Sequence, residues 1–150
     1  MMVFFAFESD FVDSLRCIPM QVRYKLDTCG IKFKLSDWNH LTKEDREVLV
    51  EKPCSTEAEI QAYREDIQRL ISQRTGTQAT ELPIDPHPGW LDATTVPANL
   101  KEKVIELGLR LTLQQWVALT PLQRFALIKL SRPGHENENF PKAMMEFNLH

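Results

Sequence analysis

Hydrophobic residues recur at helical spacing along much of the chain, and the longest such pattern lies between Thr56 and Gly76. Its apolar positions fall on one face of a helix, namely Ile60, Tyr63, Ile67, Leu70 and Ile71. Thr56 and Glu59 have the spacing of a capping box, and Gly76 is a typical residue to follow a helix end. The pattern therefore predicts a helix between these two boundaries.

A second pattern occurs twice, and its two occurrences match residue for residue. When the chain is shifted by 78 residues, Ile18–Val50 falls on Val96–Ile128 without a gap. The nine identical pairs are Pro19 and Pro97, Lys25 and Lys103, Gly30 and Gly108, Leu35 and Leu113, Trp38 and Trp116, Leu41 and Leu119, Thr42 and Thr120, Arg46 and Arg124, and Leu49 and Leu127. Because tryptophan is rare, the matched tryptophans favour a duplicated supersecondary unit over chance.

Each copy is predicted to fold into three helices. The first begins at a proline and stops at a glycine, the short second helix carries the tryptophan, and the third follows a threonine cap. The expected boundary residues are Pro19 and Pro97, Gly30 and Gly108, Ser36 and Thr112, and Thr42 and Thr120. Residues 140–149 look like a shorter equivalent of the long helix that follows the first copy. The predicted class is all-α, with two tandem copies of a three- to four-helix unit.

We expect one domain over residues 1–150, with repeat one at about 11–76 and repeat two at about 96–150. The linker at about 77–95 is rich in proline, so it is not expected to be helical. It also holds Leu82, Ile84, Trp90 and Leu91, which a flexible tether would not need, so we predict that it is ordered against the helices. Val3–Phe7 is interpreted as an extended arm packed on the helices rather than a strand.

The composition excludes several classes of protein. With a net charge of −3 and a pI near 5.8, the chain lacks the basic excess of a nucleic-acid binder. No apolar run suggests a membrane span, and the N-terminus lacks the basic region of a signal peptide. An odd number of widely spaced cysteines (Cys17, Cys29 and Cys54) favours a reducing compartment, and we predict a cytoplasmic protein without a disulfide.

The chain shows no catalytic or metal-binding motif, so we expect neither an enzyme nor a cofactor. Cys29 matches Leu107 in the other copy, which favours a core residue over a ligand, whereas Cys17 and Cys54 flank helices and could approach each other. His87 lies in a proline-rich turn, and no nucleophile or orienting partner can be assigned to it. The carboxylates clustered after residue 43 are typical of a solvated helix face.

The most suggestive charged feature is a basic cluster in the first copy. Arg16, Arg23, Lys25, Lys32 and Lys34 occur within 19 residues, opposed only by Asp27. One interpretation is a docking surface for an acidic partner. The other is a solvated face whose long side chains cover the core. On the docking interpretation, reversing the charges of Arg23 and Lys25 should weaken binding and leave the fold largely intact.

One continuous stretch near the N-terminus carries a resemblance to a known protein family. The run Phe7–Met20, continuing through Val22–Asp27 and Cys29–Lys32, resembles the nitrate reductase-associated protein family, most strongly over residues 5–60. That family is small, of about this length, and found chiefly in cyanobacteria beside nitrate reductase and molybdenum-cofactor genes. The resemblance implies an accessory factor for assimilatory nitrate reductase, and the family has no established catalytic residues. Packing explains Glu8, Asp10, Asp13 and Arg16 poorly, so we add them to the candidate partner-binding residues.

Three functions stay open at this point. The first is a non-enzymatic accessory or maturation factor that contacts nitrate reductase or its molybdenum-cofactor maturation machinery, and not nucleic acid or a membrane. The second is a generic helical adaptor unrelated to nitrate. The third is an enzyme or redox carrier whose site assembles only in the folded chain.

Overall fold

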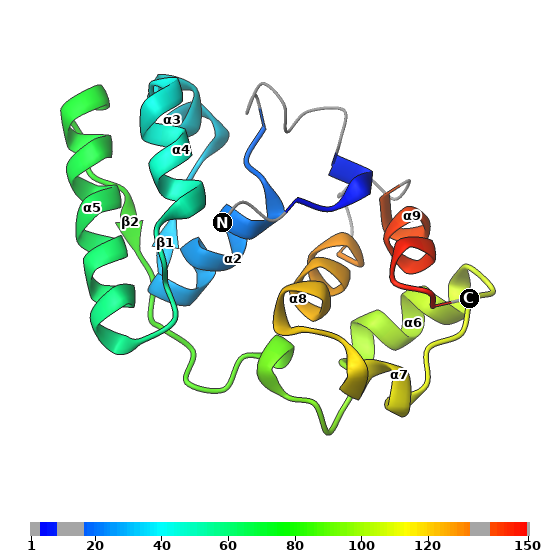
Figure 1. Ribbon diagram of the computed structural model, residues 1–150. Helices are drawn as coiled ribbons and strands as arrows, with labels where there is room; N and C mark the ends of the chain where they lie inside the picture. Colours follow the sequence, from blue (N-terminus) through cyan, green and yellow to red (C-terminus); the bar gives the residue numbers. More distant parts are fainter. Residues whose placement is uncertain (1–3, 9–16, 133–138, 150) are drawn as a thin grey trace. The chain divides into compact units, whose positions relative to one another are not determined.

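The computed structural model describes residues 4–8, 17–132 and 139–149 and is mostly helical (Figure 1). Its α-helices are α2 (Met20–Cys29), α3 (Leu35–His40), α4 (Lys43–Glu51), α5 (Glu57–Thr75), α6 (Ala98–Glu106), α7 (Leu113–Ala118), α8 (Pro121–Leu130) and α9 (Asn139–Glu146). Two 3-10 turns, η1 (Ala6–Glu8) and η2 (Gly89–Leu91), and two short strands, β1 (Ile31–Lys32) and β2 (Thr80–Glu81), complete it. The all-α prediction therefore needs a small correction, since β1 and β2 form an antiparallel sheet.

The chain divides into two compact units. The first comprises Met1–Phe4 and Glu8–Asp85, and the second comprises Phe5–Phe7 and Pro86–His150. The expectation of one domain over residues 1–150 stays a prediction.

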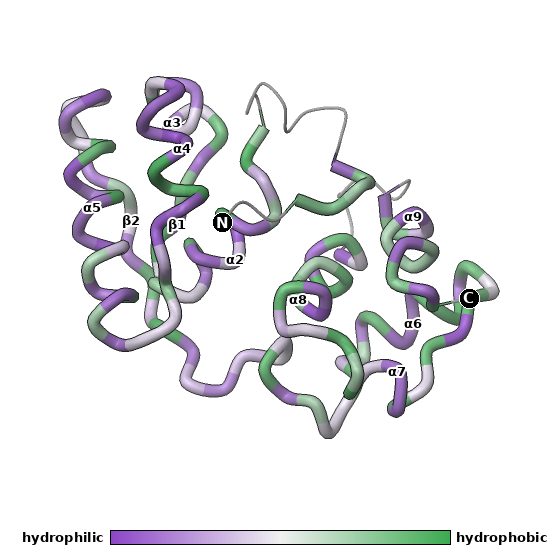
Figure 2. The backbone as a smooth tube through the Cα atoms, in the orientation of Figure 1, coloured by the Kyte–Doolittle hydropathy of each residue, from purple (hydrophilic) through white to green (hydrophobic). Residues whose placement is uncertain are grey.

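The core of the first unit lies where α2, α3 and α4 pack around the long helix α5. The predicted apolar face of α5 is confirmed, because Tyr63, Ile67, Leu70 and Ile71 are buried and Ile60 packs against them. Apolar and polar positions alternate along this helix in Figure 2. The predicted boundaries are confirmed too, by the Thr56 capping box and by Gly76 in the left-handed conformation.

The small sheet ties the linker to the first unit. Ile31 pairs with Glu81 and Lys32 with Thr80, so a segment nearly fifty residues further along the chain closes the edge that follows α2. The linker is ordered in the second unit as well, where the Trp90 ring packs edge-on against Phe125 with centroids 5.0 Å apart. The expected ordered linker stays a prediction, and the stretch expected to be non-helical contains the 3-10 turn η2.

The second unit is built around α8, which packs against α6, α9 and η2. At its N-terminal segment, Phe5 stacks on Phe7 and meets Phe147 edge-on, with centroid distances of 5.3 and 5.1 Å. The expectation of an extended arm over Val3–Phe7 is wrong for Ala6 and Phe7, which begin a 3-10 turn, and Val3 lies outside the described residues. The packing of this segment onto a helical unit is as expected, since aromatic side chains gain most from burial.

The helices of the two units follow the 78-residue shift. Helices α2, α3 and α4 begin at residues 20, 35 and 43, and α6, α7 and α8 begin at 98, 113 and 121. Trp38 and Trp116 are both fully buried, as predicted. Gly30 and Gly108 both have positive φ, at 73° and 68°. One boundary is wrong: Lys34, not Ser36, precedes α3, and the Asp37 carboxylate accepts its backbone N–H.

Candidate docking surface

The expected partner-binding residues separate into three groups. Asp10, Asp13 and Arg16 lie outside the described residues. Glu8 and Lys25 are buried, and Arg23 is half-buried. Lys32 and Lys34 are exposed. The sequence cluster is therefore not one continuous basic face in the described part of the first unit.

Lys25 stabilises the fold rather than a surface. Its ammonium donates to the backbone carbonyls of Val50 and Lys52, at 2.6 and 2.7 Å, and lies 5.8 Å from the centroid of the Tyr63 ring. These carbonyls end α4, where a cation complements the helix dipole. Burial lowers the pKa of Lys25. We therefore remove Lys25 from the docking surface, and a charge reversal there would damage the fold, contrary to our expectation.

Glu8 is buried for a similar reason at the other end of a helix. Only 1% of the residue is exposed, and its carboxylate accepts the N–H of Met20 at 2.8 Å. The first N–H groups of a helix have no intrahelical acceptor, and a carboxylate there also meets the positive end of the dipole. The start of α2 explains Glu8, which is corrected from a surface residue to a structural one.

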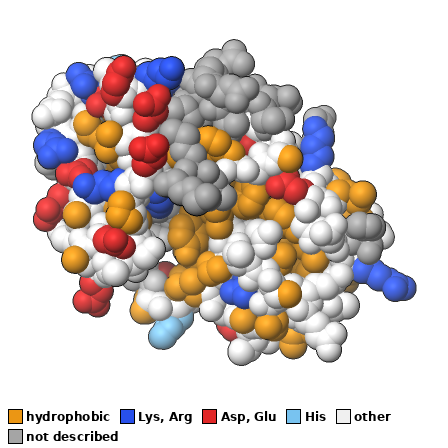
Figure 3. All heavy atoms as spheres, in the orientation of Figure 1, with side chains coloured by type: hydrophobic (Ala, Val, Ile, Leu, Met, Phe, Trp, Pro, Cys, Tyr) orange, Lys and Arg blue, Asp and Glu red, His pale blue; other side chains and the backbone are white. Residues whose placement is uncertain are grey.

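Arg23 is half-buried, and is therefore neither a core residue like Lys25 nor a fully exposed one. Its Nε donates to the Ile18 carbonyl at 3.2 Å, and burial lowers its pKa. Lys32 on β1 and Lys34 before α3 are exposed, and neither makes an ion pair with another described residue. On the face drawn in Figure 3, acidic and basic side chains are interspersed over α3, α4 and α5. Lys32 and Lys34 are thus the exposed cations that remain of the predicted cluster.

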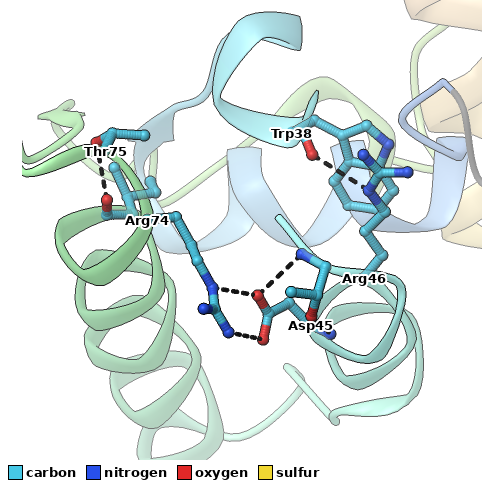
Figure 4. Close-up of polar contacts among 7 residues, drawn as sticks. Trp38, Asp45, Arg46, Arg74 and Thr75 are labelled. Atoms are coloured by element: carbon cyan, nitrogen blue, oxygen red, sulfur yellow. Dashed lines mark hydrogen bonds and ion pairs between the residues drawn. The ribbon is translucent and has the colours of Figure 1, made fainter. Parts of the chain in front are cut away.

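Ionic contacts that the sequence did not reveal join α4 to α5. Arg74 donates to Asp45 at 2.8 Å, and Asp45 also accepts the Thr42 N–H at 3.1 Å (Figure 4). Although burial opposes the effect, these hydrogen bonds hold the pKa of Asp45 below its usual value. Figure 4 also shows Arg46 donating to the Trp38 carbonyl, at 3.2 Å. These contacts fix the packing of α3, α4 and α5.

A polar groove of about 660 Å³ runs along α5 beside β2. Its cations already have partners, since Arg64 pairs with Glu81 at 3.0 Å and Arg69 with Asp66 at 3.2 Å. A basic subsite needs a cation that is not neutralised by its neighbours, so this groove is a poor anion site.

Burial disfavours the thiolate form of two cysteines in the first unit. Cys29 is fully buried, as predicted for a core residue, and burial raises its pKa to about 12. Burial likewise raises the pKa of Cys54 to about 11, and its Sγ contacts the Lys25 carbonyl at 3.8 Å. The thiolate is the nucleophile and the metal ligand, so burial disfavours the reactive form of both groups. The three cysteines are unpaired, and no metal-ligating cluster occurs among the described residues.

None of the helices in the described ranges is long and apolar enough to cross a membrane.

The comparisons with known proteins place the chain in a family. No curated protein and no solved structure matches the chain. A family model described as conserved nitrate reductase-associated protein matches residues 4–147, almost the whole sequence. The match extends beyond the N-terminal stretch that carries the resemblance and includes both compact units, so the chain belongs to the nitrate reductase-associated protein family.

Proposed function

We propose that the protein is a non-enzymatic accessory or maturation factor for assimilatory nitrate reductase, acting in the cytoplasm through contact with that enzyme or its molybdenum-cofactor maturation machinery. The family match over residues 4–147 carries the proposal. The chemistry of the described residues supports it, because burial raises the pKa of the Cys29 and Cys54 thiols and the cations of the polar groove are paired.

The contact surface that we assign within the first unit includes Lys32 and Lys34. Both cations are exposed and unpaired among the described residues, so an acidic partner could approach them without first breaking an ion pair. Charges at the rim of an interface act mainly on the association rate and are screened by salt. Complex formation should therefore weaken as the salt concentration rises.

We also infer that residues 18–50 and 96–128 descend from one duplicated unit. The matched helix starts, the buried tryptophans and the left-handed glycines support this inference. So does a shared contact: the Nε atoms of Arg46 and Arg124 donate to the carbonyls of Trp38 and Trp116 at 3.2 and 3.0 Å.

The test is a charge reversal at the two exposed lysines. Lys32→Glu with Lys34→Glu should leave the melting curve nearly unchanged, since exposed substitutions usually cost less than ~0.5 kcal/mol. The matched control, Arg132→Glu with Lys142→Glu, makes the same change in net charge at two exposed positions of the second unit. Each variant is expressed as the sole copy in nitrate-grown cells, and nitrate reductase activity is measured beside co-purification.

We expect lower nitrate reductase activity and weaker co-purification for the lysine pair, and normal values for the control. Normal activity in cells that lack the protein altogether would refute the accessory role and favour an adaptor unrelated to nitrate. Full activity of the lysine variant, with the deletion strain impaired, would refute only the assigned surface. Turnover of nitrate by the purified chain alone would contradict a non-enzymatic role.

A further inference from the structure

The segment that follows the left-handed glycine is covered by a strand in the first unit but not in the second. In the first unit, β2 covers this segment: the Leu82 N–H donates to the Gly30 carbonyl at 2.7 Å. The approach is so close that a Cβ atom built on Gly30 would lie 2.5 Å from the Leu82 oxygen. The apolar residues beside it are hidden, and Cys29 and Ile31 are 0% and 2% exposed.

In the second unit the equivalent segment, Leu109–Leu111, has no strand beside it among the described residues. A Cβ atom built on Gly108 would meet nothing within 4 Å. Neither the Gly108 carbonyl nor the Arg110 backbone has a hydrogen-bond partner in the described part of the chain. Ile105 is 76% exposed and Leu107 is 37% exposed. Exposed apolar side chains beside an unpaired backbone are typical of an edge to which a strand can be added.

A groove of about 480 Å³ lies along this open segment. Its walls are largely apolar, with Val96, Val104 and Leu109 among the residues that line it. Two cations, Lys101 and Arg110, also line it, and neither forms an ion pair with a described residue. The groove thus offers apolar contacts, free backbone groups and unneutralised positive charge to the same occupant.

We propose that this groove binds an extended segment of a partner protein that carries apolar side chains and a carboxylate and pairs, antiparallel, with Leu109–Leu111. The first unit shows what such an occupant looks like, because the equivalent edge there is covered by Thr80-Glu81-Leu82-Pro83-Ile84. That segment supplies a donor to the glycine carbonyl and apolar side chains, and its Glu81 pairs with Arg64 of α5. The carboxylate of the proposed occupant is inferred from the unpaired cations Lys101 and Arg110 of the groove. Strand addition of this kind takes its affinity from main-chain hydrogen bonds and its specificity from side-chain pockets.

The probe is a fluorescent peptide with the sequence of residues 78–85, Gln-Ala-Thr-Glu-Leu-Pro-Ile-Asp, titrated onto the purified full chain and followed by anisotropy. We expect saturable binding, and no binding of a scrambled peptide. Arg110→Glu should weaken binding about tenfold or more. The matched control Lys142→Glu, an exposed charge reversal on α9, should leave it within twofold. Circular dichroism checks that both variants stay folded.

Two further measurements isolate the mechanism. A peptide with lysine in place of its threonine should bind Arg110→Glu better than it binds wild type, because the register of β1 and β2 sets that threonine position opposite the residue equivalent to Arg110. N-methylation of the peptide's leucine removes the donor expected to reach the Gly108 carbonyl and should abolish binding. N-methylation of the glutamate should be tolerated, because alternate N–H groups of a strand point to opposite sides.

Equal binding of the scrambled peptide, or undiminished binding to Arg110→Glu, would overturn the proposal, as would an absence of binding to the wild-type chain. The assay contains no nitrate reductase, so its failure would not bear on the accessory role. Conversely, a failed Lys32 and Lys34 experiment would leave the groove in place.

Discussion

Replacing Arg124 by methionine tests how the second unit holds its shortest helix. The Arg124 side chain is buried, and its guanidinium donates to the carbonyls of Trp116, Val117 and Trp90 at 3.0, 3.0 and 3.2 Å. It also lies 5.8 Å from the centroid of the Trp116 ring. One side chain therefore joins the C-terminal end of α7 to the linker, and α7 has only six residues.

The expected cost follows from these contacts. A hydrogen bond from a charged donor contributes about 1.5–3 kcal/mol to stability, and a buried acceptor left without its donor adds to the loss. Methionine keeps part of the packing, and water can reach part of the freed backbone. We therefore expect Arg124→Met to lower the free energy of unfolding by about 3–5 kcal/mol.

The first unit supplies the matched control. Arg46 makes the equivalent contact to the Trp38 carbonyl, at 3.2 Å, but it is only half-buried. Because water can solvate the groups that are freed there, Arg46→Met should cost about 1–2 kcal/mol. Arg124→Lys should recover only part of the loss, because a single ammonium cannot reproduce the fork of a guanidinium.

The assay is urea unfolding followed by far-ultraviolet circular dichroism and tryptophan fluorescence. Two compact units can unfold in separate steps, so the transitions are fitted separately where they are resolved. If Arg124→Met lowers the free energy of unfolding by less than about 1 kcal/mol, or by no more than Arg46→Met does, the buried hydrogen bonds of Arg124 do not have the stabilising role proposed here.

Three further predictions concern stability. Trp116→Ala should cost on the order of 3–5 kcal/mol in urea unfolding, because the ring is fully buried and its Nε1 donates to the Asp92 carbonyl at 2.9 Å. Gly30→Ala should lower the melting temperature much more than Gly108→Ala. Both glycines are left-handed, but only at Gly30 would the new methyl group collide with backbone atoms. Equal decreases in melting temperature for the two variants would contradict this. The lowered pKa of Asp45 means that its stabilisation is present above the unfolded value, near 3.8, and is lost as the pH falls through the lower folded value. Melting curves of Asp45→Asn should therefore depend less on pH below about 4 than those of wild type.

Much of the helical fold could be predicted because its boundaries are local. Thr56 and Glu59 are three residues apart and satisfy each other's backbone donors, so the start of α5 can be predicted without knowing what it packs against. Gly76 likewise ends α5 by its own conformational freedom. The start of α3 was wrong because Lys34 is not a capping residue by type, and the Asp37 carboxylate does the capping from within the helix.

Two features could not be predicted from local patterns. The β1–β2 pairing joins two-residue strands far apart in sequence, and a two-residue strand has no periodicity to detect. The burial of Lys25 was misjudged because lysine is usually exposed. A signal was present, since Lys25 falls on an identical residue, Lys103, under the 78-residue shift, and the Lys103 side chain is also only 12% exposed. A lysine at matched positions on two apolar helix faces points to a structural role.

The edge that follows the left-handed glycine is covered in the first unit and open in the second, and this difference supports our proposal of a binding site in the second unit. A three-helix unit with a left-handed glycine leaves a backbone edge after its first helix. In the first unit β2 covers that edge, and the fourth helix, α5, has nineteen residues, whereas the fourth helix of the second unit, α9, has eight. A unit that served only to fill the fold would gain stability by closing this edge, since exposed apolar surface costs about 25 cal/mol per Å². This cost is the physical reason for our proposal that the open, partly cationic edge at Leu109–Leu111 binds a partner.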